Sequence, residues 1–147
     1  MKYKLEPEGE MFRLILLKDI PGHKAGERGG VVSGEHNLSQ EGGCWVADNA
    51  QVSEAARVSG DAQVFGVAWV FGNARVFGDA QVYGNAWVYG NARVFGSARV
   101  FGSAGVCGDA QVFESAWAFE SAGVCGSAKV SGAAEVCGDA QVFGNAR

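Results

Sequence analysis

The sequence predicts an all-β solenoid, in which short strands coil into a triangular prism with 18 residues per turn. Two observations predict this fold: small residues dominate the composition, and they recur at a period of six. Gly, Ala and Val supply 23, 22 and 19 of the 147 residues, and glycine stands at about twice its usual frequency of roughly 7%. Leu and Ile number only seven, all at or before Leu38, which excludes a core of leucine-rich helices in residues 46–147.

The repeat runs through residues 46–147. Ala recurs every sixth residue from Ala50 to Ala146, and Val keeps the same period from Val52 to Val142 except where Ala118 replaces it. A period of six fits neither an α-helix nor a long strand, but it fits a short strand followed by a tight corner. Gly stands at the corner with Asn, Asp or Ser after it, residues that tolerate a positive φ. Three units close one coil, and successive coils stack about 4.8 Å apart through parallel strands.

This unit resembles the hexapeptide-repeat family, whose members form left-handed parallel β-helices. In that family an aliphatic residue points inward at the first position and a small residue at the fifth, and Val76 and Ala80 match these positions. The resemblance covers residues 46–147 and implies the left-handed coil. It also implies a narrow interior of Val and Ala that is too tight for any ligand.

Residues 1–45 form a separate cap and lead-in. The segments 2–6 and 11–19 are predicted to be strands on either side of Pro7–Glu10, which indicates an antiparallel hairpin. A solenoid exposes backbone edges at its ends, so we expect the hairpin to cover the N-terminal edge. This lead-in is similar to that of bacterial, prophage and phage hexapeptide proteins sometimes labelled transferases. At the other end, the open last coil favours pairing with another copy.

Composition and charge exclude several classes of protein. Hydrophobic residues make up 48% of the chain and the net charge is −4, which is unlike a disordered protein. A pI near 5.1 argues against nucleic-acid binding. No apolar run is long enough to span a membrane, and the first residues do not resemble a signal peptide. We therefore expect a cytoplasmic protein without a membrane partner.

The histidines argue against catalysis. Two activities known in the hexapeptide superfamily are acyl transfer from coenzyme A, which needs a histidine base, and zinc-dependent carbonic anhydrase chemistry, which needs three histidines. Only His23 and His36 are present, and both precede the coils. We expect them to be polar loop residues, and we expect no catalytic residue, no cofactor and no metal site.

The four cysteines give no metal motif. Cys107 and Cys125 are one coil apart and should stack at about 4.8 Å, a separation that permits a disulfide. A cytoplasmic chain would keep them as thiols, so we expect Cys to replace the Phe or Ser of other repeats. Glu114 and Glu120 replace corner glycines on either side of Ala118, which indicates either a recognition feature or drift in a tolerant repeat.

The period places the outward residues on three faces. The first face carries Trp69 and Phe71, then Trp87 and Tyr89, then two bare rungs with Gly105 and Gly123, which predicts a step or shallow depression. The candidate binding residues lie on the first and second faces and are Trp69, Phe71, Trp87, Tyr89, Arg75, Arg93, Phe77, Phe95 and Phe143.

Exposed aromatic ladders indicate an interface. Stacked rings stabilise one another by a fraction of a kcal/mol, but three such columns exceed what a soluble monomer leaves bare. Arg75 and Arg93 stack as like charges, which predicts either a counter-charge from a partner or anionic ligand, or arginines lying over Phe rings.

The sequence therefore predicts a non-catalytic solenoid that binds protein, as a homo-oligomer. The family resemblance suggests a phage or prophage accessory protein that blocks a host or defence factor. The alternatives are a degenerate acyltransferase and a self-assembling filament.

Overall fold

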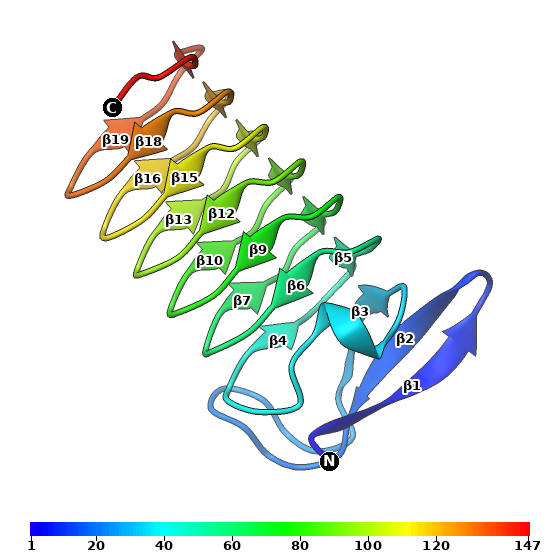
Figure 1. The fold of residues 1–147 in the computed structure, drawn as a ribbon. Coiled ribbons are helices and arrows are strands. Elements are labelled where there is room, and N and C mark those ends of the chain that lie inside the picture. Colours follow the sequence, from blue (N-terminus) through cyan, green and yellow to red (C-terminus); the bar gives the residue numbers. More distant parts are fainter.

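Each six-residue unit forms a two-residue strand and a corner in the computed structural model, which describes all 147 residues (Figure 1). In the unit that begins at Val76, the valine and Ala80 are both fully buried. The corner residue between them, Gly78, has a φ of +67°. Glycine adopts this left-handed conformation without the steric cost that a Cβ atom brings. The corner glycine therefore turns the chain while the interior receives only Val and Ala.

The units stack into three parallel sheets, one on each side of the prism (Figure 1). Sheet I contains β5 (Gln51–Val52), β8 (Trp69–Val70), β11 (Trp87–Val88), β14 (Gly105–Val106), β17 (Gly123–Val124) and β20 (Gln141–Val142). Sheet II contains β6 (Arg57–Val58), β9 (Arg75–Val76), β12 (Arg93–Val94), β15 (Gln111–Val112) and β18 (Lys129–Val130). Sheet III contains β4 (Trp45–Val46), β7 (Gln63–Val64), β10 (Gln81–Val82), β13 (Arg99–Val100), β16 (Trp117–Ala118) and β19 (Glu135–Val136).

Successive coils are in register at a spacing of 18 residues. Trp87 pairs with Trp69 on one side and with Gly105 on the other. The Trp69 N–H donates to the Ala86 carbonyl at 3.0 Å, and the same pattern repeats along the prism. The predicted fold class, a left-handed parallel β-helix with an N-terminal hairpin, is confirmed.

The hairpin extends sheet I at its N-terminal end. Strands β1 (Tyr3–Glu8) and β2 (Met11–Leu16) are antiparallel, β2 pairs with β3 (Arg28–Val32), and β3 joins β5 in parallel. The strands differ by a few residues from the expected 2–6 and 11–19, because Pro7 lies within β1 rather than in the turn. β1 is an edge strand, where a proline is tolerated because one side of the backbone has no partner.

An irregular coil precedes the first regular one. Val32 lies in β3, Leu38 pairs with Val58 of sheet II, and Val46 lies in β4 of sheet III. These inward residues are spaced by six and eight positions. A 3-10 turn, Glu35–Asn37, lies in the first interval, and the two extra residues lie in the second, between Leu38 and Val46. The Asn37 side chain is buried and donates to the carbonyls of Glu54 and Ala56, so it takes the place of strand hydrogen bonds there. The coils therefore begin inside the lead-in segment.

Larger side chains close the core at this end. Trp45, Tyr3, Leu14 and Leu16 are fully buried and continue the column of Val and Ala. A Cβ atom at Gly29 would lie 2.5 Å from the carbonyl oxygen of Val46, so this glycine lets β3 approach β4. No helix is both long enough and apolar enough to cross a membrane.

Candidate binding surfaces

Sheet I presents a rigid aromatic cluster formed by two adjacent coils. The rings of Phe71 and Tyr89 stack at 5.0 Å between centroids and lie within 3° of parallel. Trp69 and Trp87 meet edge to face at 5.7 Å and 76°. Their side chains remain 36% and 48% exposed, so the cluster faces solvent. These four predicted residues therefore form one surface, which we call the aromatic rungs.

The next two coils of sheet I are bare. Gly105 and Gly123 take the positions of the two tryptophans, and Cys107 and Cys125 take those of Phe71 and Tyr89. A depression of about 330 Å³ lies where the two surfaces meet, lined by Asn85, Trp87, Tyr89, Ser103, Ala104 and Gly105. The step predicted from the sequence is present at this point. We call Gly105, Cys107, Gly123 and Cys125 the bare rungs.

Cys107 and Cys125 are joined by a disulfide, which corrects the expectation of two separate thiols. Their Cα atoms are 4.6 Å apart because they occupy the same position on adjacent parallel strands. This spacing falls within the range that a disulfide spans. Cys44 is a buried free thiol and Cys137 an exposed one.

The bare rungs are not required by the backbone. The corner glycines all have positive φ, whereas Gly105 and Gly123 do not. A Cβ atom at Gly105 would meet nothing closer than 4.0 Å, and one at Gly123 would meet nothing within 4 Å. Glycine within a strand is destabilising by roughly 0.5–1 kcal/mol relative to alanine. The absence of side chains here therefore needs an explanation other than folding.

Sheet I is also the uncharged face of the prism. Its outward residues are Gln51, Ser53, Trp69, Phe71, Trp87, Tyr89, Gly105, Cys107, Gly123, Cys125, Gln141 and Phe143. The predicted residue Phe143 lies at the far end of this sheet from the aromatic rungs and is 68% exposed. Val67, at the corner that leads into β8, is 52% exposed and was not predicted as a site residue. Its signal in the sequence is a large apolar residue where most other corners carry Asn, Asp or Ser.

Sheet II carries a charged column beside an aromatic one. Arg75 and Arg93 pair on adjacent coils, and the rings of Phe77 and Phe95 stack at 4.9 Å. All ion pairs of the protein lie within residues 4–28, so these arginines have no carboxylate within 4.0 Å. The cation–π contact in the structure belongs instead to Arg99, which lies 5.5 Å from the ring centre of Trp117 on sheet III.

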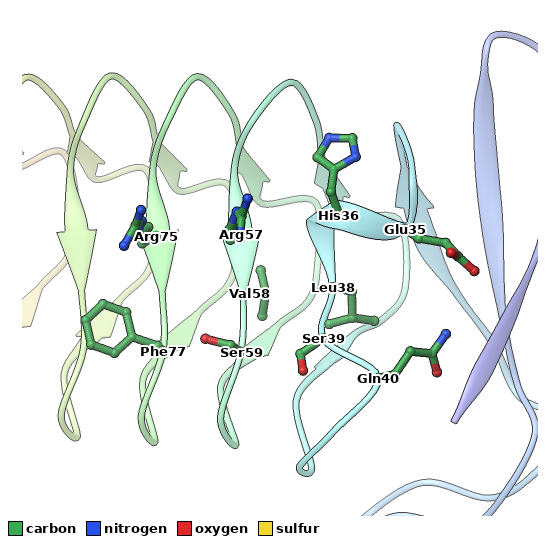
Figure 2. A pocket seen from close by; sticks show the side chains of 10 residues that line it. All are labelled: Glu35, His36, Leu38, Ser39, Gln40, Arg57, Val58, Ser59, Arg75 and Phe77. Atoms are coloured by element: carbon green, nitrogen blue, oxygen red, sulfur yellow. The ribbon is translucent and has the colours of Figure 1, made fainter. Parts of the chain in front are cut away.

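A hollow of about 620 Å³ opens where sheet II meets the irregular first coil (Figure 2). Figure 2 shows Arg57 and Arg75 side by side on adjacent coils, with Ser59 and Phe77 beside them. The hollow is lined by Glu35, His36, Leu38, Ser39, Gln40, Arg57, Val58, Ser59, Arg75 and Phe77. Sequence reasoning missed Arg57 as a site residue, because the hollow exists only where the irregular coil juts out over sheet II.

Both histidines make contacts within the N-terminal region or its border. His23 Nδ1 lies 2.6 Å from Glu27 Oε2, and its Nε2 lies 3.3 Å from Gln63 Oε1. His36 donates from Nε2 to the Glu54 carbonyl at 2.6 Å. No group of three or more His, Cys, Asp and Glu side chains is arranged to hold a metal ion.

Two of the four corner residues that have a positive φ without being glycine cap the backbone of the following coil. Glu114 has a φ of +58°, and its Oε2 accepts a hydrogen bond from the Gly132 N–H at 2.9 Å. Asp48 does the same for the N–H of Gly66 at 3.1 Å. A carboxylate at a corner thus satisfies an amide that no backbone carbonyl reaches. This structural role explains why Glu114 can replace a corner glycine.

Comparison with known proteins bears on the repeat. The model of the YdcK beta solenoid repeat matches residues 68–84, 80–91 and 86–102. These segments lie in the middle of the prism and contain the aromatic rungs. A search of curated proteins finds no significant match. The chain is therefore similar to β-solenoid repeat proteins over these coils.

Proposed function

We propose that the protein is a non-catalytic β-solenoid that binds protein through sheet I. The observation that carries this proposal is that one face is both uncharged and rich in exposed apolar residues. Trp69, Trp87, Val67 and Phe143 are the exposed large apolar residues of the coils, and all lie on this sheet or at its border. The centre of a protein interface is depleted in charge and enriched in aromatic residues.

The rigidity of the face favours a protein partner. The rings of the aromatic rungs support one another at 4.9 to 6.4 Å between centroids. Side chains held in place before binding lose less conformational entropy when a partner covers them. Tryptophan and tyrosine also supply most of the binding energy in many interfaces. The depression beside Trp87 is open and shallow, which suits a protruding side chain better than an enclosed small molecule.

Two features support a non-catalytic role. The coils contain no histidine, and the carboxylates of Glu114 and Asp48 hold the backbone of the following coil. A cytoplasmic setting is part of the proposal. Because that compartment keeps thiols reduced, the Cys107–Cys125 disulfide would form there only under oxidising conditions. The resemblance of residues 1–45 to phage and prophage proteins favours a partner that is a host or defence factor.

The two alternatives have direct tests. A degenerate acyltransferase should gain thermal stability from coenzyme A or acetyl-coenzyme A. A filament should appear in electron micrographs of the purified protein. Binding of a protein through sheet I predicts neither stabilisation by coenzyme A nor the formation of filaments.

The proposal is tested with the double variant Trp69→Ser/Trp87→Ser. Its matched control is Phe95→Ser/Phe113→Ser, which removes two stacked rings from sheet II. We expect the first variant to lose association with itself and with proteins from a host lysate, while the control keeps both. Circular dichroism should show the β-solenoid intact in each. Association that survives the loss of both tryptophans would place the binding surface elsewhere.

The hollow on sheet II supports a second candidate function, the binding of a small anion. Arg57 and Arg75 line it without a carboxylate partner, and the Ser39 and Ser59 hydroxyls can donate hydrogen bonds. Guanidinium groups bind phosphate and carboxylate through paired hydrogen bonds. Titration calorimetry with inorganic phosphate should show binding that Arg57→Gln/Arg75→Gln abolishes and Arg99→Gln leaves intact. Equal heats in all three proteins would contradict this candidate.

A further inference from the structure

We infer that sheet I binds a second copy of the chain, in antiparallel orientation, so that the aromatic rungs of each copy cover the bare rungs of the other. This inference rests on the proposed function and names the partner of the same surface. Four properties of the sheet bear on this contact: the order of its residues, the space available, the distribution of charge and the area of contact.

The order of residues is self-complementary when reversed. One outward column of sheet I runs Gln51, Trp69, Trp87, Gly105, Gly123, Gln141. The second column runs Ser53, Phe71, Tyr89, Cys107, Cys125, Phe143. Consider a twofold axis that runs parallel to the strands, between the coils of Trp87 and Gly105. It places each column opposite the same column of the partner, in reverse order. Large residues then oppose small ones along both columns.

The register can be followed rung by rung. Trp87 meets the partner's Gly105, and Trp69 meets the partner's Gly123. In the second column the aromatic rings meet the partner's disulfide, and Phe143 meets the partner's Ser53. A parallel arrangement would instead place aromatic rungs on aromatic rungs and bare rungs on bare rungs, leaving a clash and a gap. Only the antiparallel arrangement fills the depression beside Trp87.

The bare rungs have the properties of a built receptor. Gly105 and Gly123 occupy ordinary strand conformations with room for a side chain, so the fold does not demand glycine there. The Cys107–Cys125 disulfide ties these two coils together. A flat and fixed surface opposite the tryptophans is what close packing between two copies requires.

Charge favours the same contact. The chain carries a net charge of −4, so two copies repel at long range. The six coil strands of sheet I carry no charged outward residue, whereas sheet II carries Arg75, Arg93 and Lys129 in one column. Two copies that meet through sheet II would bring like charges together, which is destabilising. Sheet I is a face through which identical copies can meet without this penalty.

The contact area sets the expected strength. The face contains six strands spaced about 4.8 Å apart, and each strand is about 10 Å long, which gives an area of roughly 250 Å². Stable complexes bury about 800 Å² on each partner. The face of sheet I is about a third of that area, so we expect a weak, reversible dimer that forms as the protein concentration approaches several hundred micromolar. Sedimentation velocity from ten to several hundred micromolar covers this range.

A size swap tests the register. Gly105→Trp opposes tryptophan to tryptophan and should give a monomer at every concentration. Trp87→Gly/Gly105→Trp exchanges the two sizes and should restore the dimer. The control Gln111→Trp adds the same side chain to the neighbouring strand of sheet II and should leave the dimer unchanged. Far-ultraviolet circular dichroism and thermal unfolding establish that each variant is folded.

Cross-linking tests the orientation. In a Cys137→Ser background, Gln51→Cys and Gln141→Cys should each fail to cross-link alone with a short bismaleimide. An equimolar mixture of the two should give a covalent dimer, because sheets that face each other lie about 10 Å apart. Cross-linking of either single variant alone would overturn the antiparallel register.

The two proposals fail in different ways. A wild-type protein that stays monomeric at several hundred micromolar overturns the inference of a second copy. If the tryptophan-dependent capture of a lysate protein persists in that case, the proposed function stands with a different partner. If that capture is independent of Trp69 and Trp87, the proposed function fails as well.

Discussion

The Nζ atom of Lys2 donates a hydrogen bond to the carbonyl oxygen of Cys44 at 2.7 Å, in a site closed to solvent. The same ammonium lies 3.2 Å from the Cys44 Sγ and 3.4 Å from the carbonyls of Glu41 and Gly42. One side chain therefore ties the first residues of the chain to the turn that enters β4. Because β4 is the first strand of sheet III, this contact closes the end of the solenoid.

Because Lys2 makes these buried contacts, its substitution should lower the stability of the protein substantially. Lys2→Met should destabilise the protein by about 2 kcal/mol, because it leaves buried carbonyls without a donor. Lys4→Met is the control, since Lys4 is exposed and makes a surface ion pair with Glu6 at 3.9 Å. Such pairs contribute about 0–1 kcal/mol. Urea denaturation measures both changes, and equal effects of the two substitutions would contradict the assigned role of Lys2.

Tyr3 predicts a loss of stability at high pH. Its hydroxyl donates to the carbonyl of Leu38, and burial, followed by the nearby Glu35 and Cys44, raises the pKa of Tyr3 from 10.0 to about 12. The folded state therefore holds the phenol proton more tightly than the unfolded state does. This contribution is complete below pH 10 and is lost between pH 10 and 12, at a cost of about 2 kcal/mol.

The Tyr3→Phe variant isolates this effect. It should be less stable than the wild type by about 1–2 kcal/mol at pH 8, because the Leu38 carbonyl loses its donor. The difference between the two proteins should shrink as the pH rises from 9.5 to 11.5. Denaturation curves at a series of pH values measure it, and a constant difference would show that Tyr3 does not titrate as described.

Corner glycines should differ in their tolerance of a side chain. A Cβ atom at Gly108 would lie 2.9 Å from the Gly126 backbone, whereas one at Gly144 would meet nothing within 4 Å. Both residues have the same left-handed backbone, with φ of +64° and +66°. Gly144→Ala should cost about 1–2 kcal/mol from the backbone conformation alone, and Gly108→Ala should cost more. Thermal unfolding of the two variants gives the comparison.

A carboxylate side chain at position 108 should reduce the loss of stability that a substitution of Gly108 causes. Asp48 and Glu114 show that an acidic side chain at a corner can accept the glycine N–H of the next coil. Gly108→Asp should therefore be less destabilising than Gly108→Ala, although it is the larger residue. The reverse order would mean that an aspartate at position 108 gains no stabilising hydrogen bond from the Gly126 N–H.

The regular coils could be predicted from the sequence because each inward position is set by its own unit. Val76 and Ala80 repeat every six residues, and this period alone assigns Phe71 and Tyr89 to one column. The first coil could not be predicted, because Val32, Leu38 and Val46 are spaced unevenly and are recognised only by their pairing. Lys2 gave no signal either, since a lysine near a chain terminus is ordinarily exposed and its burial depends on residues 41–44.

The candidate surfaces were predictable to different degrees. The step on sheet I follows from the order of Trp87 and Gly105 along one column. The hollow on sheet II does not, because it depends on how the irregular coil projects beside Arg57. From the sequence we expect Cys107 and Cys125 to be thiols, whereas they form a disulfide. Their spacing indicates only that they are close and says nothing of their oxidation state.

The disulfide predicts how many thiols react under each condition. In the native protein only Cys137 should react rapidly with a thiol reagent, since Cys44 is buried and the other two cysteines are joined. Unfolding without a reductant should expose Cys44, and reduction should then release Cys107 and Cys125. For the 18 residues that the bond encloses, the loop-closure model gives a stabilisation of about 3 kcal/mol. The neighbouring strands already restrain this loop in the native coil, so the Cys107→Ser/Cys125→Ser variant should still fold. It should unfold at a lower denaturant concentration than the wild type. Rapid reaction of three thiols in the untreated native protein would show that the bond does not form.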